Sequence, residues 1–222
     1  MVFKFISNLK NSEKGTTLIE IAVVLFIIAL FFTIMIIGLP EIERRFALSR
    51  STYRLAQDLR KARDLSISGV KVKDSAGNEI IPKGDGVYIN ITNLLDGTKE
   101  YVIYADVSGD EHMYTDNGSY EYCKDKNPID SDCVIDIINI SKENPSLYIK
   151  RINTVAIDPN DGHEINSTTD VASINFLPPN PNVKMVDTVG GDFISVEIVL
   201  GIDGSSNERT VSINKAGLIN IQ

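Results

Sequence analysis

The fold of this chain is decided by residues 16–39, which read TTLIEIAVVLFIIALFFTIMIIGL. Glu20 is the only charged residue among these 24 positions, and most of the others are apolar. At a rise of about 1.5 Å per residue, a helix of this length spans about 36 Å, which exceeds the hydrocarbon core of a bilayer. The sequence therefore predicts a membrane-spanning helix near its N-terminus.

Two common kinds of apolar segment fit this stretch less well. A cleaved secretory signal has an apolar core of roughly 7–15 residues followed by a small-x-small cleavage site. This run is longer, and no such site follows it. A simple membrane anchor explains the length but not Glu20, because a carboxylate costs roughly 2.5–3.5 kcal/mol at the centre of a membrane helix and less near its end. Glu20 therefore requires a partner.

Residues 14–20 read KGTTLIE and lead directly into the apolar run. They resemble the prepilin cleavage site of type IV pilins and type II secretion pseudopilins. The resemblance implies that a prepilin peptidase removes the leader, residues 1–15, by cutting between Gly15 and Thr16, and that it methylates the new amino group of Thr16. It also implies that Glu20 pairs with the N-terminal amine of a neighbouring subunit during assembly. The chain departs from the family at Thr16, where most members have Phe.

The same resemblance implies a location, partners and a function. It describes a filament subunit of a type IV pilus or a type II secretion system, and the cleavage-site residues are shared by both. Before assembly such a subunit crosses the inner membrane once, with its head in the periplasm or outside the cell. The implied partners are other pilin or pseudopilin subunits, the prepilin peptidase and inner-membrane lipid.

From Glu41 onward the helical pattern continues but becomes amphipathic. Apolar or small side chains recur at spacings of three and four residues, which places them on one face of a helix. These residues are Leu48, Thr52, Leu55, Leu59 and Ala62. Basic residues occupy many of the other positions, either as a solvated face or as contacts for acidic heads or lipid headgroups. The helix is expected to end near Gly69, because glycine can supply a C-terminal stop.

After Gly69 the apolar pattern becomes an alternation typical of β-strands. Hairpin turns are expected at Asp96-Gly97, at Asp203-Gly204 and before Gly217. The expected strands are residues 87–92, 100–105, 134–140, 147–152, 171–177, 193–200, 209–214 and 218–221. The sequence therefore predicts an α+β, pilin-like fold, in which a long helix over residues 16–69 packs on an antiparallel β-sheet head over residues 70–222.

The C-terminal strands carry a second resemblance. Residues 173–179 read SINFLPP, and residues 210–219 read TVSINKAGLI. They are similar to the GspH/FimT-like minor pilins and pseudopilins, in which an I-x-F-x-P strand and a final hairpin ending in G-x-I close the head. This resemblance favours a minor pilin or pseudopilin. Relatives in DNA-uptake systems bind DNA through basic C-terminal residues, whereas the last 30 residues here contain only Arg209 and Lys215 as basic residues.

The charge of the head excludes some functions. Residues 70–222 contain 12 basic and 24 acidic residues, a net charge of −12. Such a surface repels a phosphate backbone, so nucleic-acid binding is disfavoured. The chain has no G-x-S-x-G, H-E-x-x-H or P-loop motif, and we expect no enzymatic activity. The alternative from another class is a ligand-binding or adhesive head displayed on a pilin stalk, for which the polar residues 108–133 are the candidate region.

Two cysteines, Cys123 and Cys133, lie ten residues apart, which is not a C-x-x-C spacing. If the head faces an oxidising compartment, we expect a disulfide that closes this polar loop. The alternative is two unpaired thiols.

Residues 158–164, which read DPNDGHE, have the composition of a metal site. The side-chain oxygens of Asp158, Asn160, Asp161 and Glu164 are the kind that Ca²⁺ prefers. The same residue types also build ordinary tight turns, and their spacing is not that of an EF-hand. We therefore expect a turn and no cofactor, with calcium as the alternative. The two histidines, His112 and His163, are expected at the surface.

Overall fold

The computed structural model describes residues 17–91, 98–107, 114, 120–126, 131–158, 160–179, 182–188 and 190–222. The chain divides into two compact units, Met1–Glu43 and Arg44–Gln222. The first unit contains the apolar segment. The second contains the amphipathic part of the helix and the β-strands. The fold is α+β, with a long N-terminal helix followed by antiparallel sheets, as the sequence predicts.

Helix α1 spans Leu18–Ser68 and continues through Pro40. It ends where predicted, because Gly69 adopts a φ of 57°, a left-handed conformation that favours glycine. The Gly69 N–H donates to the Ser66 carbonyl at 3.2 Å, and the Val70 N–H donates to the Leu65 carbonyl at 3.4 Å. These two bonds form a Schellman cap, which satisfies carbonyls that the last turn leaves without helical partners.

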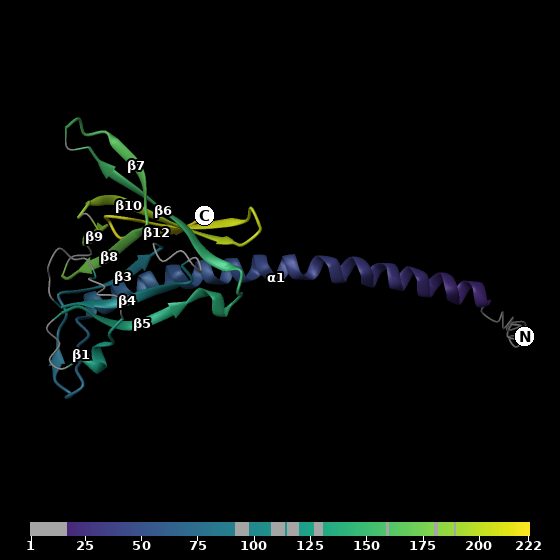
Figure 1. The fold of residues 1–222 in the computed structure, drawn as a ribbon, viewed down its shortest axis with the longest axis horizontal. Helices are drawn as coiled ribbons and strands as arrows, with labels where there is room; N and C mark the ends of the chain where they lie inside the picture. Colours follow the sequence, from purple (N-terminus) through teal and green to yellow (C-terminus); the bar gives the residue numbers. More distant parts are fainter. Residues whose placement is uncertain are drawn as a thin grey trace, which may run out of the picture. The chain divides into compact units, whose positions relative to one another are not determined.

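Most of the strands form two five-stranded antiparallel sheets (Figure 1). One sheet has the order β12-β11-β10-β6-β7, and the other has the order β5-β4-β3-β8-β9. The short strands β1 and β2 pair separately. The strand bounds are β1 Val72–Lys73, β2 Glu79–Ile80, β3 Gly84–Asn90, β4 Glu100–Asp106, β5 Cys133–Asn139, β6 Leu147–Ile157, β7 Glu164–Thr169, β8 Val171–Leu177, β9 Asn182–Val186, β10 Phe193–Ile202, β11 Glu208–Asn214 and β12 Ile219–Ile221. Two 3₁₀ helices, η1 Cys123–Asp125 and η2 Ile140–Lys142, flank β5.

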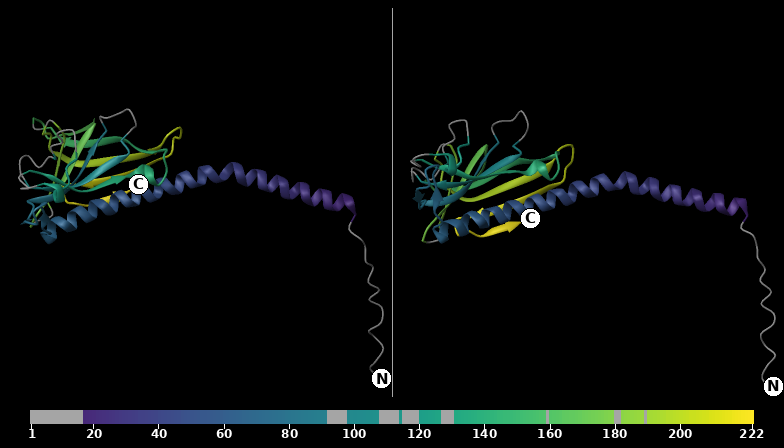
Figure 2. Two further views of the ribbon diagram at one scale, coloured as in Figure 1. Left: turned by 60° about the horizontal axis from the view of Figure 1, so that its bottom comes forward. Right: turned by 90° about the horizontal axis from the view of Figure 1, so that it is seen from below.

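The core of the second unit contains side chains from α1 and from both sheets. Figure 2 shows the last part of α1 lying along the strands. Ile103 and Phe176 contribute from one sheet, and Ile198 and Val211 contribute from the other. All the residues predicted for the buried helix face are buried, namely Leu48, Thr52, Leu55, Leu59 and Ala62. Each fully buried Leu or Ile contributes roughly 1.5–3 kcal/mol by leaving water. The Thr52 hydroxyl donates to the Leu48 carbonyl at 2.7 Å, so this buried polar group has a partner.

All eight predicted strands form, as β3, β4, β5, β6, β8, β10, β11 and β12. Four further strands were not predicted. Strand β7 reads EINSTT and lies exposed at a sheet edge, so it has no apolar alternation to reveal it. Strand β9 is short and follows a proline-rich loop, and β1 and β2 have two residues each.

Two of the three predicted hairpin turns are present. Gly204 connects β10 to β11 with a φ of 71°, and Gly217 connects β11 to β12 with a φ of 75°. The third turn, Asp96-Gly97, lies outside the described residues, although its flanking strands β3 and β4 pair antiparallel.

Candidate functional site

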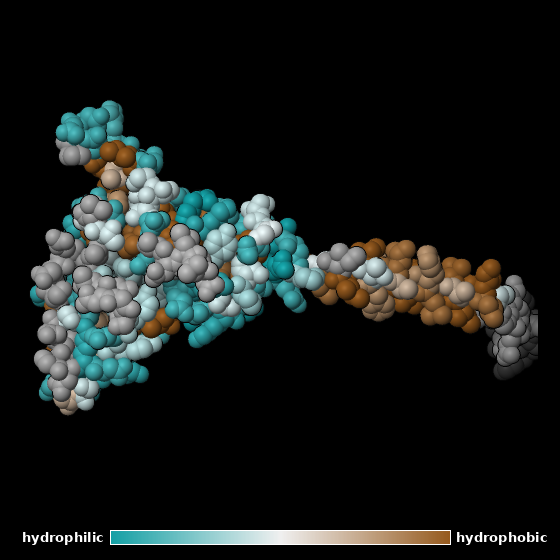
Figure 3. All heavy atoms as spheres, viewed as in Figure 1, coloured by the Kyte–Doolittle hydropathy of each residue, from teal (hydrophilic) through white to brown (hydrophobic). Residues whose placement is uncertain are grey.

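The apolar part of α1 is the candidate membrane and assembly site. An 18-residue window of this helix has a mean hydropathy of 3.1, and none of that window is buried. Its large side chains are exposed all around the helix, from Ile28 at 45% to Leu18 at 87%. Figure 3 shows this segment as mostly hydrophobic (brown) on the face in view. The helix is therefore long and apolar enough to cross a membrane.

Glu20 lies in the first turn of α1, where it forms a reciprocal cap with Thr17. The Glu20 Oε2 accepts from the Thr17 N–H at 2.9 Å and from its hydroxyl at 3.0 Å. The Thr17 Oγ1 accepts from the Glu20 N–H at 3.3 Å. This arrangement is a capping box, which satisfies backbone N–H groups at a helix start. The T-x-x-E pattern of residues 17–20 is typical of this cap. The cap is thus a second role for Glu20, beside the predicted role in assembly. Gly15 and Thr16 lie outside the described residues.

A second polar group of the apolar segment is also satisfied locally. The Thr33 hydroxyl donates to the Ala29 carbonyl at 2.8 Å. Such a bond allows a hydroxyl to lie within an apolar surface without a partner from outside the helix. Of the described polar side chains in this segment, Glu20 is the one that also carries a charge.

Cys123 and Cys133 form a disulfide, with a Cα–Cα distance of 4.8 Å. Cys123 lies in η1 and Cys133 begins β5, and both are buried against Ala105 and neighbouring apolar side chains. Beside the disulfide, Tyr122 makes an isolated bridge to Val134. The disulfide thus holds the η1 segment against the start of β5, which fits the first of the two alternatives left by the sequence.

The residues of the calcium alternative form a turn between β6 and β7. The Asp158 Oδ1 accepts from the N–H of Asn160 at 2.8 Å and from its side-chain amide at 3.0 Å. The Asp161 Oδ1 accepts from the His163 N–H at 2.9 Å. Glu164 begins β7 and is exposed. Within the described part of the chain, no group of three or more His, Cys, Asp or Glu side chains is placed to hold a metal. His112 lies outside that part.

A buried acidic pair in the head was not found from the sequence. Asp85 on β3 is 2% exposed, and Asp106 on β4 is fully buried. The Asn175 side-chain amide donates to Asp106 Oδ2 at 2.5 Å, whereas no hydrogen bond or ion pair from the described residues reaches the Asp85 carboxyl. Burial, and then the Asp106 charge, raise the pKa of Asp85 from 3.8 to about 7. In the sequence, the one indication of this buried carboxyl is the position of Asp85 between two glycines of a strand, Gly84 and Gly86.

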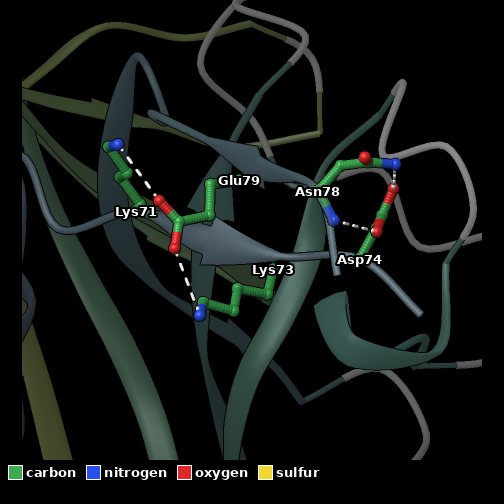
Figure 4. Close-up of polar contacts among 5 residues, drawn as sticks. All are labelled: Lys71, Lys73, Asp74, Asn78 and Glu79. Atoms are coloured by element: carbon green, nitrogen blue, oxygen red, sulfur yellow. Dashed lines mark hydrogen bonds and ion pairs between the residues drawn. The ribbon is translucent and has the colours of Figure 1, made fainter. Parts of the chain in front are cut away.

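The β1–β2 hairpin is held by polar contacts, which are exposed around Glu79 and partly buried around Asp74 (Figure 4). Lys71 Nζ and Lys73 Nζ lie 3.0 Å and 3.1 Å from the two carboxylate oxygens of Glu79, and their hydrogen bonds lower the pKa of Glu79. The Asp74 carboxylate accepts from the Asn78 side chain and from two backbone N–H groups, which lowers the pKa of Asp74. These contacts shape a turn.

Comparisons with known proteins add no assignment to this geometry. No family model matches the chain, and neither a curated protein nor a solved structure matches it.

Proposed function

We propose that this chain is a pilin-like subunit, a minor pilin or pseudopilin, of a type IV pilus or a type II secretion filament. In this proposal it acts as a structural subunit and not as an enzyme. A prepilin peptidase cuts after Gly15 and methylates Thr16. The apolar part of α1 then holds the chain in the inner membrane, with the β head on the outer side, until the helix joins the helices of other subunits.

The observation that carries the proposal is the apolar surface of α1, which is exposed on all sides of the helix. A contiguous surface of this kind is unstable in water and needs lipid or other apolar helices around it. A subunit that leaves a membrane to enter a filament needs lipid around this surface first and the apolar helices of other subunits afterwards. A soluble binding protein needs neither.

Glu20 supports the assembly step. Its carboxylate is satisfied within its own helix by Thr17, so the cap lowers the cost of placing this group in a membrane. In a bundle of helices, a cationic amine of a neighbouring chain neutralises the remaining charge. A buried charge that loses its partner costs about 3–5 kcal/mol, so such a pair favours correct registration of each incoming helix.

The disulfide supports the placement of the head. Disulfides persist in oxidising compartments such as the periplasm and the cell surface, and they are rare in the cytosol. Cys123 and Cys133 are bonded in the head, so the head is suited to the outer side of the inner membrane.

Mass spectrometry of the N-terminal peptide tests the proposal, using chain produced in cells with an active prepilin peptidase. The expected peptide begins at Thr16 and is heavier by one methyl group. Cells without the peptidase serve as the control and should yield the peptide with its leader. A peptide that retains residues 1–15 in both strains would refute the proposed function and leave a simple membrane anchor.

A further inference from the structure

The β6–β7 hairpin arm, defined as residues 157–170, presents an unpaired strand edge at the margin of one sheet. β7 is the last strand in the order β12-β11-β10-β6-β7, and among the described residues it pairs only with β6 (Figure 1). Every residue of β7 except Thr169 is exposed. Natural edge strands are commonly blunted by Lys, Pro or bulges, whereas β7 contains neither Lys nor Pro, and its pairing with β6 is regular. This edge is therefore open to a partner.

The hairpin arm combines apolar and acidic side chains. Ile157 is 46% exposed and Ile165 is 45% exposed. The arm carries four acidic residues, Asp158, Asp161, Glu164 and Asp170, and no Lys or Arg occurs between Arg151 and Lys184. Among the described residues, Asp158 and Asp161 accept hydrogen bonds only within the turn, and no ion pair reaches Glu164 or Asp170. The arm thus favours a partner that is basic and partly apolar.

The solvent side of the last turns of α1 offers a surface of that chemistry. A groove of about 330 Å³ is lined there by Arg60, Lys61, Leu65 and Val70, together with Gln57, Asp64 and Ser68, and the Asp64 carboxylate lies 3.5 Å from the Arg63 guanidinium. Arg60 has no ion-pair partner among the described residues. Lys61 Nζ lies 3.9 Å from Asp136, with both side chains about half exposed. Val70 is 45% exposed. The helix groove therefore has cations beside an apolar floor.

The charge distribution of the whole second unit orients such a contact. Residues 44–64 contain seven basic and two acidic residues, a net charge of +5, whereas residues 70–222 carry a net charge of −12. Two heads that meet through their acidic surfaces repel one another. Repulsion becomes attraction when the basic helix segment of one copy faces an acidic part of another.

We propose that the hairpin arm of one copy of this chain docks into the helix groove of a second copy. Asp161 and Glu164 face Arg60 and Lys61, while Ile157, which lies opposite Glu164 on the same face of the hairpin, packs on Leu65 and Val70. The arm and the groove are different surfaces, so the contact is heterologous and repeats from copy to copy instead of closing a dimer. The inference rests on the proposed function and, within it, on a filament that contains neighbouring copies of this chain.

Charge reversal of the full-length chain tests the docking. One variant carries Asp161→Lys with Glu164→Lys, a second carries Arg60→Glu with Lys61→Glu, and a third combines all four substitutions. Self-association is measured by energy transfer between labelled chains reconstituted in vesicles of neutral lipid. Each double variant is expected to associate at least about tenfold more weakly, since attraction becomes repulsion at two sites, and the combined variant is expected to regain the original strength. Association of the unaltered chain is expected to weaken as salt is raised.

The matched control carries Asp203→Lys with Ser206→Lys on the β10–β11 turn, another exposed hairpin end, and it is expected to associate like the unaltered chain. Unchanged thermal unfolding shows that each variant is folded. Equal association of either double variant and the unaltered chain would overturn the docking, as would a combined variant that gains nothing. No association of the unaltered chain would overturn it too. If these results accompany a peptide that begins at Thr16, the docking fails while the proposed function stands.

Discussion

Replacing Asp85 with Asn is expected to stabilise the head near pH 8 and to change its stability little near pH 4. Asp85 is 2% exposed in β3. Burial, and then the charge of Asp106, raise its pKa from 3.8 to about 7. The ionised carboxylate is therefore the disfavoured form in the folded chain.

The size of the effect follows from the two pKa values. The unfolded chain loses this proton near pH 3.8, whereas the folded chain keeps it until about pH 7. Within this window the folded state binds more protons, so the contribution of Asp85 lowers stability progressively as pH rises and then stays level. At about 1.4 kcal/mol per pH unit, the full cost is about 4 kcal/mol near pH 8 and about 0.5 kcal/mol near pH 4. Asn has nearly the same shape and no charge, so it removes this cost.

Thermal unfolding of the full chain in detergent micelles, followed by circular dichroism, measures the difference. For a domain of this size, about 4 kcal/mol corresponds to a midpoint higher by about 8–16 °C near pH 8, and the gain near pH 4 is about 1–2 °C. Asp170→Asn, at an exposed position after β7, is the matched control and is expected to shift neither midpoint. An equal gain at both pH values, or a loss near pH 8, would refute the reasoning.

Three further predictions concern other parts of the chain. Cys123→Ser with Cys133→Ser is expected to lower the free energy of unfolding by about 3 kcal/mol; a thermal midpoint that responds neither to the variant nor to a reductant would contradict this. Gly86→Ala would place a Cβ 2.6 Å from a backbone carbonyl oxygen of β8. The substitution is expected to destabilise the head by about 1–3 kcal/mol in the same assay. An unchanged thermal midpoint would be evidence against the close approach of β8 to Gly86. Glu20→Gln retains an acceptor for the helix cap but loses the charge; immunoblots should show normal leader removal and at least about a tenfold smaller share of chain in sheared filaments, and an equal share would remove the assembly role of Glu20.

The helix and most strands could be predicted because their patterns are local. Leu48, Leu55 and Leu59 recur with the helical period, and each is buried. The alternation in β11 likewise shows which residues face the core. Such an element has one buried face and one exposed face, so the period of its apolar residues is enough to predict which side chains are buried.

The rest depends on contacts that the local pattern does not contain. Strand β7 forms because β6 offers an edge, and its exposed side chains leave no alternation to detect. The burial of Asp85 follows from the pairing of β3 with both β4 and β8, and a lone acidic residue among glycines reads equally well as a turn. The cap at Thr17 differs, because its T-x-x-E spacing is local and is recognisable from the sequence alone.

The two parts of α1 have side-chain patterns that suit different surroundings. Residues 47–66 carry a one-sided pattern, with Ala56 buried and Tyr53 56% exposed, because one side meets the protein core and the other meets water. The apolar segment before Glu41 has no such polar side, because lipid and neighbouring apolar helices are equally acceptable on every side. Apolar side chains alone therefore give little preference for one helix register over another. In the proposed filament, a single charged group near the helix start would supply that preference, and Glu20 is the charged residue that the described part of the segment contains.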